Sequence, residues 1–270
     1  VFFISLVSNL YYKSEANLFS EKEKSEKLLL NILPIKIADE LKEKGYTKPR
    51  LYNDVSVLFT DFVGFTMIAE KLSPEKLVNE LDNCFSYFDS VAKKYNLEKI
   101  KTIGDSYMCA GGIPENNTTH AIDCVLAALE IQSFMKQMKE IKESQNHPYW
   151  ELRLGINTGA LVAGVVGETK FAYDIWGDTV NTASRMESSG VAGKINISSD
   201  THKIVRHLFV CEHRGKVKAK RKGEIDMYFV GGIRTEYSRD EKGNVPNDRF
   251  HDIYQKIKKG KSITDLIVLE

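Results

Sequence analysis

The chain has 270 residues, of which 42% are hydrophobic and 28% are charged, a composition typical of a folded globular protein rather than a disordered one. Its 38 basic and 37 acidic residues leave a formal net charge of +1, so it lacks the strong positive field expected of a nucleic-acid-binding protein. No nucleic-acid partner is therefore predicted. The 4 cysteines form no CxxC pair, which argues against a zinc site or a disulfide framework.

Residues 1–19 open with the apolar run VFFISLVSNLYYK. This run is shorter than the ~20 apolar residues that a membrane-spanning helix needs. Two interpretations stay open: the last turns of a membrane helix, with Tyr11, Tyr12 and Lys13 at the interface, or a frayed amphipathic start.

We expect residues 20–50 to form a helical linker for dimerisation or signalling. Leu30, Leu33, Ile37 and Leu41 follow three- and four-residue steps, so they form one apolar stripe on a helix that Pro34 interrupts. The stripe fits a partner helix in a parallel dimer, and it equally fits packing on the chain's own domain.

We expect residues 51–233 to form the main domain. A strand ends at Asp61, and a helix over 73–95 follows, with Ser73 as its N-cap. EKIKTIGDSYM predicts two strands joined at Gly104-Asp105, a helix over 118–142 comes next, and WELRLGIN is a strand. The order strand, helix, hairpin, helix, strand predicts an α+β fold with a ferredoxin-like split βαβ palm sheet and flanking helices.

In the rest of this domain, the sequence predicts shorter elements. They are a strand in LVAGVVG, a short helix in GDTVNTASRMES, a strand in GKINISS, a helix over 200–207 and a ribbon over 209–231. Residues 234–270 form a polar C-terminal extension with one helix candidate over 248–259 and no evident chemistry.

Two groups of polar residues point to chemistry. Asp61 and Asp105 should meet at one sheet edge, where two carboxylates and substrate phosphates can hold Mg²⁺. Asn181 and Arg185 are four residues apart on one helix face, and Asp174 precedes that helix. By spacing alone, a solvated helix face explains the second group better.

Five motifs together resemble the class III nucleotidyl cyclases, in order and with similar separations. They are FTDFVGFT, EKIKTIGDSYM, LRLGINTG, YDIWGDTVNTASRM and RGKVKAKRKG. The resemblance covers residues 54–231 and favours the bacterial, homodimeric adenylyl cyclases. The preceding segment SEKLLLNILPIKIADELKEKG also resembles the dimeric linker of many bacterial members.

The resemblance implies a metal site in which Asp61, Asp105 and the backbone carbonyl of Phe62 hold two Mg²⁺ or Mn²⁺ ions. One ion would activate the ribose 3′-hydroxyl, and the other would hold the triphosphate and the leaving pyrophosphate. The reaction it implies is the in-line conversion of ATP to 3′,5′-cyclic AMP and pyrophosphate, with no side-chain nucleophile.

Lys101 and Asp174 match the two residues that read the base. A lysine donates to adenine N1 and a carboxylate accepts from the N6 amino group, whereas guanine presents the opposite pattern. Guanylyl members usually carry Glu at the first position and a small residue, often Cys, at the second. The resemblance therefore implies ATP as the substrate.

The resemblance also implies that Asn181 orients the ribose and that Arg185 neutralises charge on the α-phosphate in the transition state. Lys220 and Arg153 match residues that contact the phosphates. Arg221 stands where the family commonly has Gly, which puts the backbone path beside Lys220 in doubt.

In the family, one chain supplies the metal aspartates and the other supplies the base, ribose and transition-state residues. Because this chain carries both sets, the resemblance implies a homodimer with two sites. The alternatives are a guanylyl cyclase and an inactive nucleotide-binding regulatory module. The expected location is a cytoplasmic catalytic domain, joined in a longer chain to an upstream sensor or a membrane tether.

Overall fold

The computed structural model describes residues 2–167, 169–219, 223–263 and 266. It divides into two compact units. The first comprises residues 1–49 and 164–174, and the second comprises residues 50–163 and 175–270. Lys220 and Arg221 lie outside the described residues.

The first unit contains two helices, α1 (Phe2–Leu30) and α2 (Ile35–Lys44). Helix α1 runs without a break through residues 19 and 20, so the predicted boundary there is not an element boundary. Pro34 is the N-cap of α2, because a proline cannot continue the preceding helix. The prediction of a single stripe on one helix face is therefore wrong, since its residues are divided between α1, a turn and α2.

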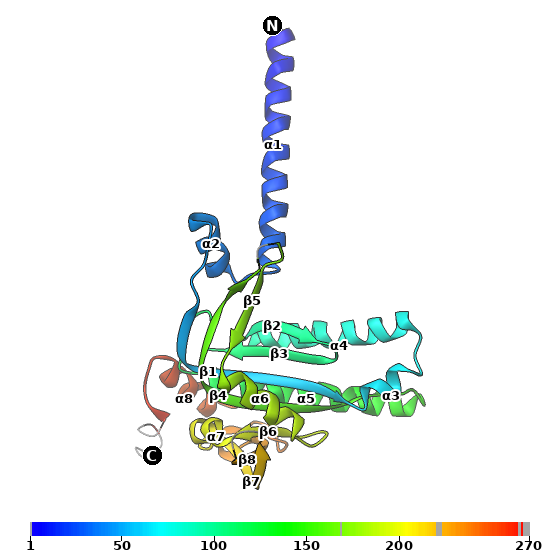
Figure 1. The fold of residues 1–270 in the computed structure, drawn as a ribbon, viewed down its shortest axis with the longest axis vertical. Helices are drawn as coiled ribbons and strands as arrows, with labels where there is room; N and C mark the ends of the chain where they lie inside the picture. Colours follow the sequence, from blue (N-terminus) through cyan, green and yellow to red (C-terminus); the bar gives the residue numbers. More distant parts are fainter. Residues whose placement is uncertain (1, 168, 220–222, 264–265, 267–270) are drawn as a thin grey trace. The chain divides into compact units, whose positions relative to one another are not determined.

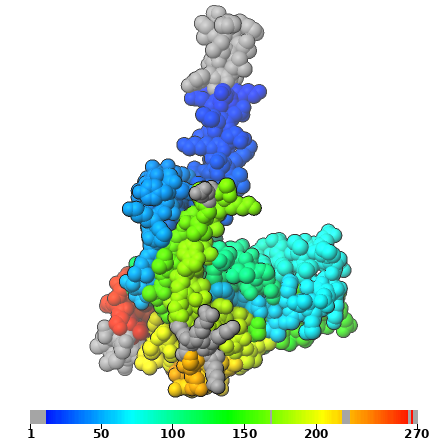
Figure 2. Space-filling model, viewed as in Figure 1, coloured from blue at the N-terminus to red at the C-terminus, as the bar shows by residue number. Residues whose placement is uncertain are grey.

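The linker residues differ sharply in exposure. Leu33 and Ile37 are buried within the single chain, so their burial requires no second copy. In contrast, Leu18, Phe19 and Leu28 are exposed. They belong to the part of α1 that is drawn in dark blue in Figure 2. The described helices include none with the length and apolarity needed to cross a bilayer. A parallel dimer through α1 stays a prediction.

The strands form one eight-stranded sheet, in the order β2-β3-β1-β4-β6-β8-β7, with β5 paired to β4 (Figure 1). The strands are β1 (Arg50–Val63), β2 (Glu98–Ile103), β3 (Ser106–Gly111), β4 (Glu151–Val166), β5 (Ala172–Trp176), β6 (Ile195–Ser198), β7 (Phe209–Ala219) and β8 (Gly223–Ile233). Strand β3 pairs antiparallel with both β1 and β2, and β4 pairs antiparallel with β1. This is the predicted ferredoxin-like arrangement, which is confirmed.

Strand β4 differs from the prediction of two separate strands. It is one strand of 16 residues that includes all of WELRLGIN except Trp150 and most of LVAGVVG. Pairing with β1 continues from Glu151 to Ala163, so no turn forms at Gly159. Strand β5 was not predicted, because its five residues show no simple alternation of polar and apolar side chains.

Two long helices, α4 (Pro74–Lys94) and α5 (His120–Ser144), pack on one face of the sheet. Ser73 caps α4 by accepting a hydrogen bond from the Lys76 amide, as predicted. The main core lies on this face, where Leu58, Leu154 and Ile156 from the strands join the apolar sides of both helices. The remaining helices are α3 (Phe65–Ala69), α6 (Asp178–Ser188), α7 (Ser199–Val205), the 3-10 helix η1 (Thr235–Tyr237) and α8 (Asp248–Lys258).

The predicted helix of the C-terminal extension is α8, and it belongs to the core. Phe250, Ile253 and Ile257 are buried in the main core. The Tyr254 hydroxyl donates to Asp123 of α5 at 2.7 Å. Burial raises the pKa of Asp123 to about 6, against the opposing effect of the hydrogen bonds from Tyr254 and Thr119.

Replacing Tyr254 by phenylalanine tests this docking. The buried Asp123 carboxylate loses a donor, so we expect Tyr254→Phe to lower the free energy of unfolding by about 1–2 kcal/mol. Because the lost bond favours the charged form of Asp123, the loss should be larger at pH 8 than at pH 5. Urea denaturation at both pH values measures it, and Tyr46→Phe, at an exposed tyrosine, is the control. An equal loss at both pH values would contradict the assignment.

Candidate active site

Asp61 lies near the end of β1, opposite Arg153 of β4 in the register of the sheet. Its two carboxylate oxygens have different partners. Oδ1 accepts a hydrogen bond from the Ser106 hydroxyl at 2.7 Å, and Oδ2 accepts one from Arg153 Nη2 at 2.7 Å. The carboxylate is therefore held in one orientation by side chains from β3 and β4.

Asp105 lies in the turn between β2 and β3, and β3 pairs with β1, so the predicted convergence with Asp61 is present. The Asp105 carboxylate accepts a hydrogen bond from the backbone amide of Phe62. Partial burial, followed by the nearby Asp61 carboxylate, raises the pKa of Asp105 above its usual value. A nearby carboxylate that raises the pKa of Asp105 in this way favours a cation beside the two acidic groups.

Phe62 fixes the backbone beside these carboxylates. Its ring points to the α4–α5 face, where it packs against Trp150 at 5.2 Å between ring centroids and against Phe85 and Phe88. The side chain is only 2% exposed. Because the ring is locked in the core, the Phe62 carbonyl and the adjoining Asp61 cannot move independently.

Glu187 is a member of this cluster that the sequence analysis missed. It lies on α6, is 7% exposed, and places Oε1 3.1 Å from Arg153 Nε. The contact is an ion pair in which the N–H does not point at the oxygen. Burial, and then the Asp61 carboxylate, raise the pKa of Glu187 to about 7. The available signal was a glutamate four residues after Ala183, on the buried stripe of α6.

Helix α6 reaches this position because β4 carries glycines beneath it. Side chains alternate along a strand, so Leu154 and Ile156 face α5 while Gly155 and Gly159 face α6. A Cβ on Gly155 would lie 2.0 Å from the Glu187 backbone nitrogen. Motif LRLGINTG therefore permits a helix to lie directly on the sheet, on the face opposite α4 and α5.

Polar contacts then hold the start of α6. Asn157 Nδ2 donates to the Thr179 carbonyl at 2.9 Å, and the Thr179 hydroxyl donates to the Ala160 carbonyl at 2.5 Å. At the other end, Asn196 Nδ2 donates to the Met186 carbonyl at 2.7 Å. The helix is thus fixed to the sheet at both ends.

Asn181 and Arg185 lie on α6, as predicted, and both are held away from the buried stripe. Asn181 is exposed, and Arg185 is half-buried. The Nη1 atom of Arg185 is buried and has no hydrogen-bond partner in the described chain. Burial of a charged donor without a partner is unfavourable, so an anion that accepts a hydrogen bond from this atom would stabilise it.

The other predicted site residues are dispersed. Lys101 is exposed on β2, and Asp174 is half-buried on β5, within the first compact unit. Lys220 lies outside the described residues. The second unit therefore brings together Asp61, Phe62, Asp105 and Arg153 but places Lys101 elsewhere on the sheet.

Comparison with known proteins decides the family. The model of the adenylate and guanylate cyclase catalytic domain matches residues 47–232. The chain belongs to this family. It is 38% identical to human guanylyl cyclase C over 84% of the chain and 21% of that protein, and 39% identical to an adenylate cyclase of Mycobacterium bovis over 82% of the chain and 49% of that protein. It thus spans about a fifth of one relative and about half of the other.

Solved cyclase structures have the same fold. The adenylyl cyclase CyaB from P. aeruginosa is 30% identical, with a TM-score of 0.66 over 70% of this chain and 98% of that one. The catalytic core of a rhodopsin-guanylyl cyclase with converted specificity, in complex with ATPalphaS, is 35% identical, with a TM-score of 0.63 over 68% of this chain and 98% of that one. Both cyclase types are therefore among the relatives.

The residues of this cyclase domain fit a divalent metal. No group of three His, Cys, Asp or Glu side chains suited to a metal occurs in the described ranges. Magnesium needs few protein ligands, however, because it takes its remaining ligands from water and substrate phosphates. Asp61 and Asp105, with the Phe62 carbonyl, would form such a set. The guanidinium of Arg153 now supplies the positive charge beside Asp61.

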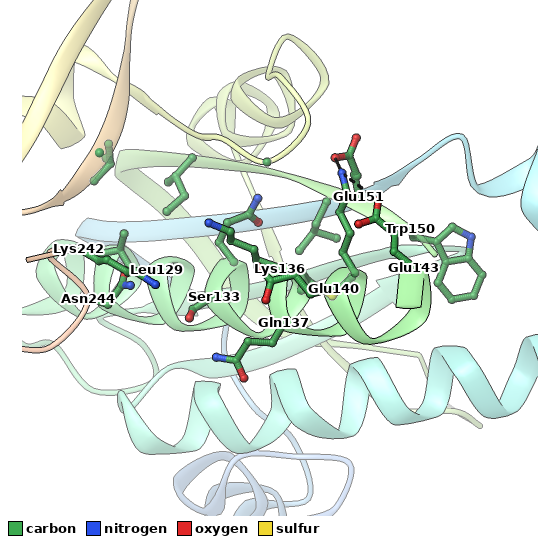
Figure 3. A pocket seen from close by; sticks show the side chains of 18 residues that line it. Leu129, Ser133, Lys136, Gln137, Glu140, Glu143, Trp150, Glu151, Lys242 and Asn244 are labelled. Carbon is green, nitrogen blue, oxygen red and sulfur yellow. Dashed lines mark hydrogen bonds and ion pairs between the residues drawn. The ribbon is translucent and has the colours of Figure 1, made fainter. Parts of the chain in front are cut away.

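A pocket of about 800 Å³ lies elsewhere in the cyclase domain (Figure 3). It is lined by the second half of α5, the start of β4 and a loop with Lys242 and Asn244. Lys136 and Glu140 of α5 project toward it, and Trp150 closes one end (Figure 3). Of the predicted site residues that the structure describes, none lines this pocket, and Asp61 and Arg153 point to the opposite face of the sheet.

Substituting Gly155 tests how α6 is positioned. The new methyl group of Gly155→Ala would overlap the backbone of Glu187, so α6 must shift. We expect a loss of about 1–3 kcal/mol in the free energy of unfolding, and a cyclase turnover at least about 100-fold lower.

The matched control is Gly231→Ala in β8, where the nearest atom to the new Cβ would be 3.8 Å away. Denaturation and cyclase assays on both variants provide the comparison. Wild-type turnover in Gly155→Ala would contradict the assignment of α6 as the helix that positions the reactive groups.

Proposed function

We propose that this domain converts ATP to 3′,5′-cyclic AMP and pyrophosphate, at two equivalent sites between two copies of the chain. The observation that carries the proposal is the cluster of Asp61, Phe62 and Asp105 in a domain of the cyclase family. Lys101 and Asp174, the residue types suited to adenine, support the choice of ATP.

Asp61, Asp105 and the Phe62 carbonyl are proposed to hold two Mg²⁺ or Mn²⁺ ions. When bound, the ions would activate the ribose 3′-hydroxyl and offset charge on the leaving pyrophosphate. The chain's own residues contribute orientation: Ser106 holds Asp61, and the Phe62 amide holds Asp105. Such fixed ligands lower the reorganisation that the site needs during the reaction.

Lys101 is proposed to donate to adenine N1, and Asp174 to accept from the N6 amino group. Guanine would leave both side chains facing a group of the same hydrogen-bonding kind, so the wrong base would leave polar groups unpaired. The identity of these two residues supports ATP over GTP. The guanylyl cyclases among the relatives make GTP the alternative substrate.

Asn181 is proposed to orient the ribose, and Arg185 to neutralise charge on the α-phosphate as the 3′-oxygen attacks and pyrophosphate leaves. The buried, unpartnered Nη1 of Arg185 supports a role that an arriving anion completes. Lys220 and Arg153 are proposed to contact the phosphates. An inactive regulatory module is the third candidate, but it would be expected to lack some of these residues.

The proposed homodimer follows from the division of labour in the family, where the metal residues of one chain face the α6 residues of the other. The similar structures include a non-canonical dimeric guanylyl cyclase domain of the RhoGC fusion protein from Blastocladiella emersonii, 32% identical with a TM-score of 0.62, and a monomeric domain of the same protein, 31% identical with a TM-score of 0.60. The homodimer therefore stays a proposal. The relative from Blastocladiella emersonii is a fusion protein, which supports the proposal of an upstream sensor or membrane domain here. The cyclase domain is proposed to lie on the cytoplasmic side.

Base selectivity is tested by cyclase assays with ATP and GTP in the presence of Mg²⁺ or Mn²⁺. We expect ATP to be preferred, and the double variant Lys101→Glu, Asp174→Cys to shift the ratio of kcat/KM toward GTP by at least about 100-fold. Asp105→Ala should abolish turnover of both nucleotides. Preferred turnover of GTP by the unmodified chain would overturn the choice of ATP.

Mixing two inactive variants tests the shared site. Asp61→Ala and Arg185→Ala should each be inactive alone, because each homodimer has two damaged sites. In the mixed dimer, one site keeps an intact Asp61 from one chain and an intact Arg185 from the other. We expect activity to return to about a quarter of the wild-type value, on a statistical mixture with independent sites. No recovery in dimers verified by native mass spectrometry would refute the arrangement.

A further inference from the structure

Three side chains link β1, β4 and α6 within one chain. Arg153 Nη2 lies 2.7 Å from Asp61 Oδ2, and Arg153 Nε lies 3.1 Å from Glu187 Oε1. The guanidinium of Arg153 therefore lies between two carboxylates, one on the proposed metal site and one on α6. A planar guanidinium can serve two carboxylates at once, which an ammonium does poorly.

Glu187 cannot readily leave this position. Its residue is 7% exposed, and its backbone lies against Gly155 so closely that no Cβ fits between them. A buried carboxylate requires a nearby positive charge when it is ionised, and Arg153 supplies one. The position of Arg153 relative to Asp61 is therefore set by α6.

Helix α6 carries residues that point in two different directions. Asn181 is exposed and Arg185 is half-buried, whereas Glu187 is on the buried stripe that faces the sheet. In the proposed dimer, Asn181 and Arg185 would act with the metal residues of the other copy. Glu187 contacts Arg153 of its own chain, and through it Asp61 of its own chain.

We propose that Glu187 is a positioning residue: it holds Arg153 so that Asp61 is oriented before metal binds, and it retains Arg153 when a metal ion takes over Asp61. This inference rests on the proposed function. It also gives each α6 a part in both sites of the dimer, because Arg185 would serve one site and Glu187 the other.

The charges of the cluster indicate the direction of the effect. When ionised, Asp61, Asp105 and Glu187 carry more negative charge than Arg153 balances, which suits a divalent cation. Without the Glu187 charge, Arg153 would pair with Asp61 alone and compete more strongly with the metal. Loss of this carboxylate should therefore weaken metal binding through Arg153.

Metal affinity provides a readout that is independent of turnover. We would titrate the full chain with Mn²⁺ and follow free Mn²⁺ by electron paramagnetic resonance, for the wild type, Glu187→Gln and the control Glu130→Gln. Glu130 pairs with Lys94 on the α4–α5 side and should bind like wild type. We expect Glu187→Gln to bind Mn²⁺ about ten-fold more weakly.

A double-variant cycle tests whether Arg153 transmits the effect. In an Arg153→Gln background, Glu187→Gln should change Mn²⁺ affinity by less than about two-fold. An equal loss in both backgrounds would mean a direct charge effect and would overturn the proposal, as would unchanged affinity in Glu187→Gln alone. If Glu187→Gln does not fold, Arg153→Lys, which keeps one charge but bridges two carboxylates poorly, should show the same loss.

Mixed dimers test which site Glu187 serves. In the Asp61→Ala and Arg185→Ala mixture, the restored site uses Asp61 of the Arg185→Ala chain. Adding Glu187→Gln to that chain should lower the restored activity about ten-fold, whereas adding it to the Asp61→Ala chain should cost less than about two-fold. The reverse pattern would show that Glu187 supports Arg185 on its own helix and would overturn the proposal.

The two failures are distinguishable. If the mixture without Glu187→Gln regains no activity, or if the wild type binds no Mn²⁺, the proposed function is at fault. If both controls succeed and only the Glu187 variants depart from expectation, the inference alone fails.

Discussion

The close approach of α6 to β4 at Gly155 is the constraint on which the site depends. Because the glycine has no Cβ, the helix backbone lies directly on the strand, and Glu187 comes within 3.1 Å of Arg153. Arg153 in turn is the cross-strand neighbour of Asp61. The missing side chain of Gly155 thus allows a single guanidinium, that of Arg153, to contact carboxylates on both β1 and α6.

The two faces of the sheet have separate tasks. The α4–α5 face holds the large core, in which Phe62 and Trp150 pack among other aromatic rings. The opposite face has Asp61 and Arg153 beside α6. Since neighbouring residues of a strand point to opposite faces, Phe62 packs in the core while Asp61 faces the site. The tight packing of Phe62 therefore restricts the backbone that carries Asp61.

The relatives explain why family membership does not determine the substrate. Adenylate and guanylyl cyclases match the chain at nearly the same identity, 39% and 38%. In the proposed mechanism, Asp61 and Asp105 would act on ribose and phosphate, which ATP and GTP share, so the same residues would serve either nucleotide. The contacts that dock α6 belong to the fold itself. Base selectivity is proposed to depend on two positions, Lys101 and Asp174. An identity or a TM-score over the whole domain gives these two positions no greater weight than any others.

The sequence by itself determined the order strand, helix, hairpin, helix, strand at the start of the domain, the Ser73 cap and the place of Asn181 and Arg185 on one helix, because these follow from local periodicity and short motifs. It also predicted that Asp61 and Asp105 converge, because the hairpin pairs with β1. It did not determine that β4 is one strand, that α1 and α2 are separate helices with Leu33 and Ile37 buried, or that α8 joins the core. It also missed Glu187, whose significance arises only when β4 and α6 meet. Contacts between residues far apart in sequence depend on packing, which no local pattern encodes.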